Sequence, residues 1–380
     1  MDGKNTIRVL IVDDSAIVRK ILSESLAAEP DIEVVGTAPD PFVAANKIAA
    51  LQPHVLTLDI EMPGMDGLTF LKKLMKHKPM PVIIVSSLAQ RSCAAALEAM
   101  RLGAIDVVAK PGGPFSVGDL KSSLATKVRA AAGARVMPDA SALKPPPSPS
   151  SAFTTAATAP AAAPPAAIIS PASPFDSSRL IAIGASTGGT EAIRVVLEQM
   201  PANSPGIVVT QHIPAGFSTA FADRLGRICK IRVREAKDGD LVEPGLALVA
   251  PGDYHMTVRR LGAGYRVVVQ TGPKVCYQRP SVDVLFNSVA EVAEDNAVAA
   301  LLTGMGADGA RGLLKILNHQ GSTIAQDEAS CVVFGMPREA IKLNAAQQIL
   351  PLTAVAQALL NASVRGTAVR NSRPAMAAGN

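Results

Sequence analysis

Residues 180–190 read Leu-Ile-Ala-Ile-Gly-Ala-Ser-Thr-Gly-Gly-Thr, and this stretch decides the fold of the second half of the chain. The apolar residues 180–183 predict a short buried strand, and the sequence after Thr190 has the apolar spacing of a helix. Between them, Gly184-x-Ser186-x-Gly188 matches the nucleophile elbow, in which a sharp strand-to-helix turn exposes a serine hydroxyl. The alternative is an ordinary glycine-rich turn with Ser186 as a helix cap.

A serine nucleophile needs a base, and two of the five histidines are placed to serve Ser186. His212 follows the strand expected at residues 206–210, and His255 lies near another strand end. A right-handed crossover puts the His212 strand beside the elbow strand, so the geometry favours His212 over His255. The other histidines lie in the first half of the chain or at the end of a helix: His54, His77 and His319.

The orienting acid is expected at Asp308, which follows the strand predicted at residues 297–303. Asp283 is the other candidate, but its position in the first turn of a helix already accounts for an acidic residue. The loop around Asp308 also has the spacing Gly304-x-Gly306-x-x-Gly309 of dinucleotide-binding turns. A carboxylate inside that loop would repel a pyrophosphate, which argues against nucleotide binding.

In residues 7–130, near-continuous apolar strands alternate with helical segments, which predicts a five-stranded, doubly wound parallel sheet covered on both faces. Chemistry in such a sheet gathers at the carboxyl ends of the strands, where Asp13, Asp14 and Asp59 would converge. Three carboxylates in one pocket repel each other unless a hard cation such as Mg²⁺ joins them. The alternative is a set of separate, solvated loop residues. Polar side chains follow two further strand ends: Ser86 and Lys110.

Composition limits the classes of protein to which the chain can belong. Its 380 residues, 48% of them hydrophobic, suit two α/β domains with well-filled cores. It has no tryptophan, and its net charge of +5 lies partly near the C-terminus, so we expect no nucleic-acid-binding face. The four cysteines form no CxxC pair, which favours reduced packing residues. The N-terminal apolar run is too short for a signal peptide or a membrane span, so a soluble, cytoplasmic protein is expected.

The composition changes between the two halves of the chain. Alanine, proline, serine and threonine dominate from about residue 137 to 177, and such a segment has few groups that could form a core. A linker of this kind lets two domains dock or separate. We therefore expect a first domain at residues 5–131, a linker at 132–175, a second α/β domain with a mostly parallel sheet at 176–364, and a loose basic tail at 365–380.

The first domain resembles the receiver domain of two-component response regulators. The resemblance rests on Asp13-Asp14, on Asp59 within Leu58-Asp59-Ile60-Glu61-Met62-Pro63, on Ser86-Ser87 and on Lys110-Pro111. It implies that Asp59 accepts a phosphoryl group from a histidine kinase, and that Asp13, Asp14 and Asp59 bind Mg²⁺. It also implies that Ser86 and Lys110 contact the phosphoryl oxygens. Residues 106–110 contain no aromatic residue, so a switch based on an aromatic rotamer is not supported.

The second domain resembles the catalytic domain of chemotaxis protein-glutamate methylesterases, the CheB family. The matching segments are Ile183–Gly189, Gln211–Pro214, Ala250–Met256, Arg279–Asp283 and Thr303–Gly309. The resemblance implies that Ser186 is the nucleophile, His212 the base and Asp308 the orienting acid. It also implies that Thr187 and the Met305 backbone lie near the reacting carbonyl. The order serine, histidine, acid differs from that of α/β-hydrolases, but triads recur on unrelated folds.

Both resemblances imply a serine hydrolase that is regulated by phosphorylation. Its substrates would be glutamate methyl esters, and by deamidation glutamines, on methyl-accepting chemoreceptors. Ester hydrolysis would need no metal, and neither nucleic-acid binding nor membrane insertion is expected. Two other classes of protein are alternatives to this interpretation. A response regulator that binds DNA needs a recognition helix with a basic face, which the second half does not show. A nucleotide-dependent oxidoreductase would have to bind its cofactor in the loop at residues 304–309.

Overall fold

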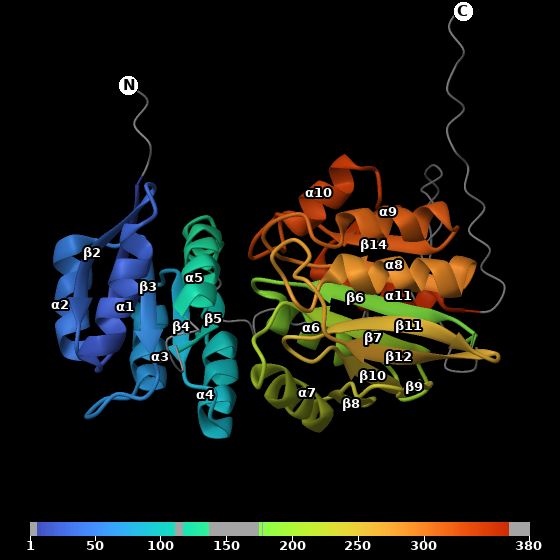
Figure 1. Cartoon of the computed structure of the whole chain (residues 1–380), viewed down its shortest axis with the longest axis horizontal. Helices are drawn as coiled ribbons and strands as arrows, with labels where there is room; N and C mark the ends of the chain where they lie inside the picture. The colour runs from blue at the N-terminus through green and yellow to red at the C-terminus, as the bar shows by residue number, and fades with distance from the viewer. Residues whose placement is uncertain (1–5, 111–116, 137–174, 177, 365–380) are drawn as a thin grey trace, which may run out of the picture.

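The computed structural model describes residues 6–110, 117–136, 175–176 and 178–364. These residues form two α/β domains that lie side by side (Figure 1). The part of the predicted linker at residues 137–174 and the predicted tail at 365–380 lie outside the described residues. Among the helices of the described ranges, none combines the length and the apolar character needed to cross a membrane.

The first domain is built on a five-stranded sheet in the order β2-β1-β3-β4-β5. Every neighbouring pair is parallel, which confirms the predicted doubly wound sheet. Its elements are β1 (Ile7–Val12), α1 (Ala16–Ala27), β2 (Ile32–Ala38), α2 (Pro41–Leu51), β3 (Val55–Asp59), α3 (Gly67–His77), β4 (Val82–Ser86), α4 (Gln90–Arg101), β5 (Asp106–Ala109) and α5 (Val117–Ala132).

Both faces of this sheet are covered because successive side chains of a strand point to opposite faces. In β1, Val9 and Ile11 cluster with side chains of α1 and α5, whereas Leu10 and Val12 cluster with side chains of α2, α3 and α4. Capping side chains accept hydrogen bonds from first-turn amides and fix where helices begin. These caps are Ser15 for α1, Asp40 for α2 and Asp66 for α3.

The second domain is built on a seven-stranded parallel sheet in the order β15-β14-β13-β6-β7-β10-β8. In a smaller antiparallel sheet, β11-β12-β9, the strands β11 and β12 form a hairpin. The elements are β6 (Leu180–Ala185), α6 (Gly189–Leu197), β7 (Gly206–Gln211), α7 (Phe217–Ile228), β8 (Arg232–Glu235), β9 (Leu241–Val242), β10 (Leu246–Val249), β11 (His255–Leu261), β12 (Gly264–Gln270), α8 (Val282–Ala293), β13 (Ala297–Leu301), α9 (Ala310–Asn318), β14 (Ser322–Gln326), α10 (Met336–Lys342), β15 (Gln348–Leu350) and α11 (Leu352–Ala362).

The central strand β6 is buried along its whole length, as expected for a parallel strand covered on both faces. Ile181 and Ile183 pack into a cluster with α6, α7 and α11. Leu180 and Ala182 pack into the opposite cluster, with α8, α9, α10 and the small sheet. The carboxyl end of β6 therefore emerges between two layers of helices, which is where the predicted elbow begins.

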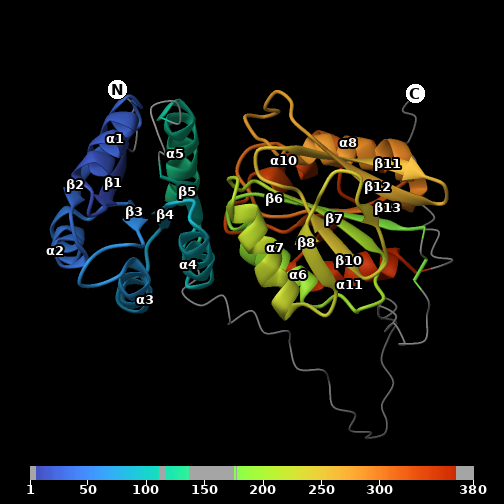
Figure 2. The same cartoon turned by 60° about the horizontal axis from the view of Figure 1, so that its bottom comes forward.

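The two domains meet along α4 and β5 of the first domain and α6 and α7 of the second (Figures 1 and 2). Arg224 of α7 donates a hydrogen bond to the carbonyl of Leu97 in α4. The amide of Arg135 donates to the carbonyl of Val332 at 3.0 Å. Residues 133–136 were expected to belong to the linker, but the structure places them at this domain interface.

Candidate active site

The turn between β6 and α6 presents Ser186 at the carboxyl edge of the large sheet. Gly188 has a φ of +77°, in the left-handed region that favours glycine. A Cβ atom at this position would also lie 2.6 Å from Cβ of Val332. The amide of Ser186 donates to the carbonyl of Thr303 at 3.0 Å, which ties the turn to the loop after β13. The hydrogen bond to the loop after β13 therefore fixes the backbone of the turn, and the turn needs a glycine at position 188.

Ser186, His212 and Asp308 form a continuous hydrogen-bonded relay. Nδ1 of His212 lies 3.0 Å from Oγ of Ser186, and Nε2 of His212 lies 2.7 Å from Oδ2 of Asp308. All three residues are buried. The sheet order explains their meeting, because β6 lies between β7 and β13 and each of the three residues follows the carboxyl end of one of these strands.

The environment of Asp308 keeps its carboxylate ionised. Burial alone would raise its pKa, but hydrogen bonds from His212 and from the backbone at the start of α8 hold the pKa below the usual range. The donors at α8 are Oγ of Ser281 at 2.8 Å and the amides of Val282 at 2.7 Å and Asp283 at 3.0 Å. An ionised Asp308 favours the tautomer with the proton on Nε2 of His212, and this leaves Nδ1 free to accept the proton of Ser186.

The competing candidates have other partners in the structure. His255 accepts from the amide of Ser281 at Nδ1, 3.3 Å away, and its Nε2 lies 2.9 Å from the carbonyl of Pro273. It therefore supports the segment that holds Asp308 rather than contacting Ser186. Asp283 accepts from the amide of Gly312 at 2.7 Å, and burial raises the pKa of its carboxyl group. The glycine-rich loop at residues 304–309 places the Asp308 carboxylate against His212, as described above.

Gln211 is a buried residue of this site that the sequence analysis did not single out. Its Nε2 donates to the carbonyl of Ser186 at 2.8 Å and to the carbonyl of His212 at 3.2 Å. One amide group thus joins the backbone of Ser186 to that of His212. The available signal was a polar residue at the carboxyl end of a buried strand.

Thr187 and Met305 were expected near the reacting carbonyl. Gly304, next to Met305, lies against Ser186, since a Cβ atom at Gly304 would be 2.6 Å from Cβ of Ser186. The side chain of Thr187 points to the first domain, and its Oγ1 donates to Oδ2 of Asp106 at 2.7 Å. The first domain therefore contacts the residue that directly follows Ser186.

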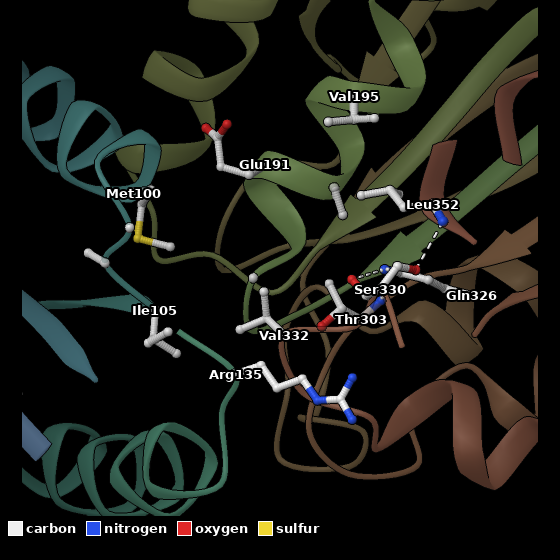
Figure 3. A pocket seen from close by; sticks show the side chains of 14 residues that line it. Met100, Ile105, Arg135, Glu191, Val195, Thr303, Gln326, Ser330, Val332 and Leu352 are labelled. Atoms are coloured by element: carbon white, nitrogen blue, oxygen red, sulfur yellow. Dashed lines mark hydrogen bonds between the residues drawn. The ribbon is translucent and has the colours of Figure 1, made fainter. Parts of the chain in front are cut away.

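Asp106 is a second site residue that sequence reasoning missed. It begins β5, and its carboxylate is paired with Lys127 at 2.5 Å while it accepts from Thr187. The amide of Gly188 adds a contact of 3.3 Å to the carbonyl of Ile105. Figure 3 shows the pocket beside this contact, with Ile105 on one side and Val332 on the other.

The first domain carries the predicted cluster of carboxylates. The carboxylate oxygens of Asp13, Asp14 and Asp59 lie within 4.8 Å of one another. Nζ of Lys110 is 3.0 Å from Asp13 and 2.8 Å from Asp59. Burial raises the pKa of Asp13 and Asp59 above the usual range, although the ion pairs with Lys110 oppose this. Ser86 lies at the adjacent strand end, where its hydroxyl donates to the carbonyl of Ser92 at 3.4 Å.

The residues of this cluster fit a magnesium ion. Burial in a group of like charges leaves Asp13 and Asp59 short of positive partners, since Lys110 supplies one charge to two carboxylates. Carboxylate oxygens are the ligands that Mg²⁺ prefers, and the ion keeps several waters when few protein ligands are present.

Both domains match known protein families. Residues 181–359 match the family model of the CheB methylesterase, and residues 9–122 match that of the response regulator receiver domain. The chain is 54% identical over 354 residues to the protein-glutamate methylesterase/protein-glutamine glutaminase 2 of Syntrophus aciditrophicus, with 93% of this chain and 98% of that protein covered. It is 50% identical over 366 residues to the protein-glutamate methylesterase/protein-glutamine glutaminase of Salmonella typhi, with 96% and 99% covered. It is 49% identical over 361 residues to the protein-glutamate methylesterase/protein-glutamine glutaminase 2 of Pseudomonas aeruginosa, with 94% of this chain and 97% of that protein covered.

The relay predicts which residues govern covalent labelling by a fluorophosphonate, a reagent for activated serines. Ser186→Ala should abolish labelling, because the nucleophilic oxygen is removed. His212→Ala should slow it by roughly 100-fold or more, since general-base catalysis is lost. His255→Ala should have a milder effect than His212→Ala, because His255 contacts Ser281 and not Ser186. Labelling that depends on His255 more than on His212 would contradict this assignment.

Proposed function

Because the chain belongs to the CheB methylesterase family and joins its catalytic domain to a response regulator receiver domain, we propose that it hydrolyses glutamate methyl esters on chemoreceptors. Deamidation of receptor glutamines, which is the same acyl transfer with ammonia as leaving group, belongs to the proposal. The observation that carries it is the relay in which His212 contacts both Ser186 and Asp308.

The relay supports a two-step mechanism. Nδ1 of His212 takes the proton of Ser186 as Oγ attacks the ester carbonyl, and the protonated imidazole then gives this proton to the departing methanol. In the second step His212 activates a water molecule that releases the glutamate carboxylate from Ser186. Asp308 holds the imidazole in place and balances its positive charge while the proton resides there. Backbone amides of the elbow turn and of the Met305 loop are the proposed donors to the developing oxyanion.

The reaction itself provides the test of this proposal. Full-length protein, incubated with a methylated cytoplasmic fragment of a chemoreceptor, should release methanol in proportion to the glutamate methyl esters present. Ser186→Ala should release none beyond the uncatalysed rate, which gas chromatography of the methanol measures. An active wild-type preparation with an equally active Ser186→Ala variant would rule out the mechanism above.

Asp59 is proposed to be the phosphorylated residue, with a chemotaxis histidine kinase as phosphodonor. Asp13, Asp14 and Asp59 would hold Mg²⁺, which neutralises the charge of the incoming phosphoryl group. Lys110 already contacts Asp59 at 2.8 Å, and its ammonium group is placed to pair with a phosphoryl oxygen. Ser86 at the neighbouring strand end would contact another of these oxygens.

Phosphorylation should depend on both Asp59 and the metal. Acetyl phosphate with Mg²⁺ should label the wild-type chain, and excess EDTA should abolish labelling. Asp59→Asn preserves the size of the side chain but removes the nucleophilic carboxylate, so it should not be labelled. Phos-tag electrophoresis reads out the phosphoprotein, and labelling of Asp59→Asn at the wild-type level would exclude this site.

The receiver domain is proposed to limit access to Ser186 until it is phosphorylated. The contacts from Asp106 to Thr187 and from Ile105 to Gly188 support this, because they lie on residues directly after the nucleophile. Phosphorylation at Asp59 would then shift the population of the chain toward an undocked, open form. Phosphorylation can raise the activity only as far as the phosphoryl group stabilises the open form more than the docked form.

A charge at the domain interface tests this regulation. Met100 is buried and lines the interdomain pocket together with Glu191 (Figure 3). Met100→Glu places a second carboxylate there, so unphosphorylated protein should gain activity by about tenfold, which corresponds to about 1.4 kcal/mol of lost docking free energy. Met100→Leu is the control and should behave like wild type.

The same variant separates docking from phosphorylation. The double variant Met100→Glu/Asp59→Asn should release methanol as fast as Met100→Glu alone. Its rate should be the same with and without acetyl phosphate. If Met100→Glu leaves the unphosphorylated rate unchanged while the receiver is shown to be displaced, for example by protease sensitivity of the domain interface, occlusion of Ser186 is wrong.

A further inference from the structure

Two of the three tyrosines of the chain are exposed, and both lie on loops beside the candidate active site. Tyr277 is 91% exposed and Tyr254 is 43% exposed, whereas Tyr265 is buried in the small sheet. Tyr254 belongs to the loop between β10 and β11. Tyr277 belongs to the connection between β12 and α8, which projects from the body of the second domain (Figure 2). We call these two loops, residues 251–254 and 273–279, the tyrosine rim.

Hydrogen bonds join the two loops of the tyrosine rim. The guanidinium of Arg279 donates to Oδ1 of Asp253 at 2.7 and 3.0 Å, and the amide of Asp253 donates back to the carbonyl of Arg279 at 3.2 Å. Arg279 also donates to the carbonyl of Gly272 at 2.6 Å, at the foot of the second loop. The two tyrosines are therefore carried by one connected surface rather than by two independent loops.

The tip of the second loop holds Tyr277 in a backbone conformation that its side chain disfavours. Val275 and Gln278 exchange two backbone hydrogen bonds, of 3.0 and 2.9 Å, around a two-residue turn. The two central residues have positive φ, +50° for Cys276 and +63° for Tyr277. Turns of this kind favour Asn-Gly, because the left-handed region is costly for a residue with a Cβ atom. A strained turn that holds an aromatic ring in solvent does not help the domain to fold, and such strain points to function.

The tyrosine rim stands next to the catalytic acid. The thiol of Cys276, the neighbour of Tyr277, lies within 4.8 Å of the carboxylates of Asp283 and Asp308. At the foot of the same loop, the carbonyl of Pro273 contacts His255, which in turn accepts from the Ser281 amide. The loop is thus built on the network that positions the relay. A polypeptide helix is about 10 Å wide. When one side chain of a substrate helix reaches Ser186, the rest of that helix therefore covers the surface of the enzyme immediately around the relay.

We propose that Tyr277, supported by Tyr254, binds the polypeptide on either side of the methylated glutamate. This inference rests on the proposed function and adds the surface that recognises the protein part of the substrate. Tyrosine offers a large, rigid contact area with a polar hydroxyl end, and it is enriched at protein interfaces for this reason. Tyr277 is exposed while the first domain is docked, so it is accessible to the substrate before the domains separate.

The backbone conformation of Tyr277 allows a sharp test with Tyr277→Gly. Glycine adopts a φ of +63° without strain, so the thermal unfolding midpoint of the variant should equal or exceed that of wild type. Removing the ring should raise KM for the methylated receptor fragment about tenfold, with kcat within about twofold of wild type. Hydrolysis of p-nitrophenyl acetate, a small ester with no polypeptide, should not change. All assays use full-length protein with acetyl phosphate and Mg²⁺.

Two further variants complete the design. Tyr277→Phe keeps the ring and should restore most of the affinity for the receptor fragment. Leu261→Ala removes another exposed apolar side chain, at the far end of β11 from the relay, and should leave KM unchanged.

The outcomes separate the inference from the function on which it rests. An unchanged KM for the receptor fragment in Tyr277→Gly, with an active wild type, overturns the role of Tyr277 alone. An equal loss on p-nitrophenyl acetate also overturns it, because Tyr277 would then act through the relay. A wild-type enzyme that hydrolyses p-nitrophenyl acetate but releases no methanol from the receptor fragment overturns the proposed function, and this inference falls with it.

Discussion

The arrangement of the second domain depends on the hydrogen bonds that the buried, ionised carboxylate of Asp308 accepts. A carboxylate removed from water is costly unless donors replace its hydration. Here His212, the hydroxyl of Ser281 and two amides at the start of α8 supply those donors. The requirement sets the position of α8 against the end of β13, and it places β7 so that His212 can reach Asp308. Ser186 then needs only the turn after the intervening strand β6 to meet the imidazole.

Both domains place their chemistry at the carboxyl edge of a parallel sheet, and β5 contacts the sites of both. At the start of this strand, Asp106 accepts from Thr187 beside the nucleophile. Directly after it, Lys110 pairs with Asp59 and Asp13 in the cluster of carboxylates. At about 3.3 Å per residue, these two positions are roughly 13 Å apart. This strand carries no aromatic residue, and an ion pair lies at each of its ends.

Sequence reasoning predicted the parts of this structure that follow from local patterns. Apolar runs located the parallel strands, and polar residues at their ends located Asp59, Ser186, His212 and Asp308, because the carboxyl ends of parallel strands share one edge. It did not predict the contact between Asp106 and Thr187, which depends on how two separate domains dock. The roles of Ser281 and His255 were hidden for a similar reason. Ser281 contacts the Asp308 carboxylate and His255 contacts the amide of Ser281, and no periodic pattern in the sequence records contacts between residues so far apart in the chain. Residues 133–136 looked like linker because their composition says nothing of the surface on which they lie.

The contacts of the domain interface decide how far the proposed regulation can work. Among the described residues its polar contacts include Arg224 with the Leu97 carbonyl and the Glu98 carboxylate, and Thr187 with Asp106. Arg135 adds hydrogen bonds from its guanidinium to the carbonyls of Glu328 and Ala329, and the amides of Arg135 and Gly188 add two backbone hydrogen bonds. A hydrogen bond contributes on the order of 1 kcal/mol net, and apolar contacts around Met100 add to these polar contacts. A shift of the equilibrium from 1:99 to 99:1 in favour of the open form needs a difference of about 5.5 kcal/mol in free energy between the two forms. In the proposed regulation the phosphoryl group at Asp59 has to supply this difference against the contacts that hold the domains together.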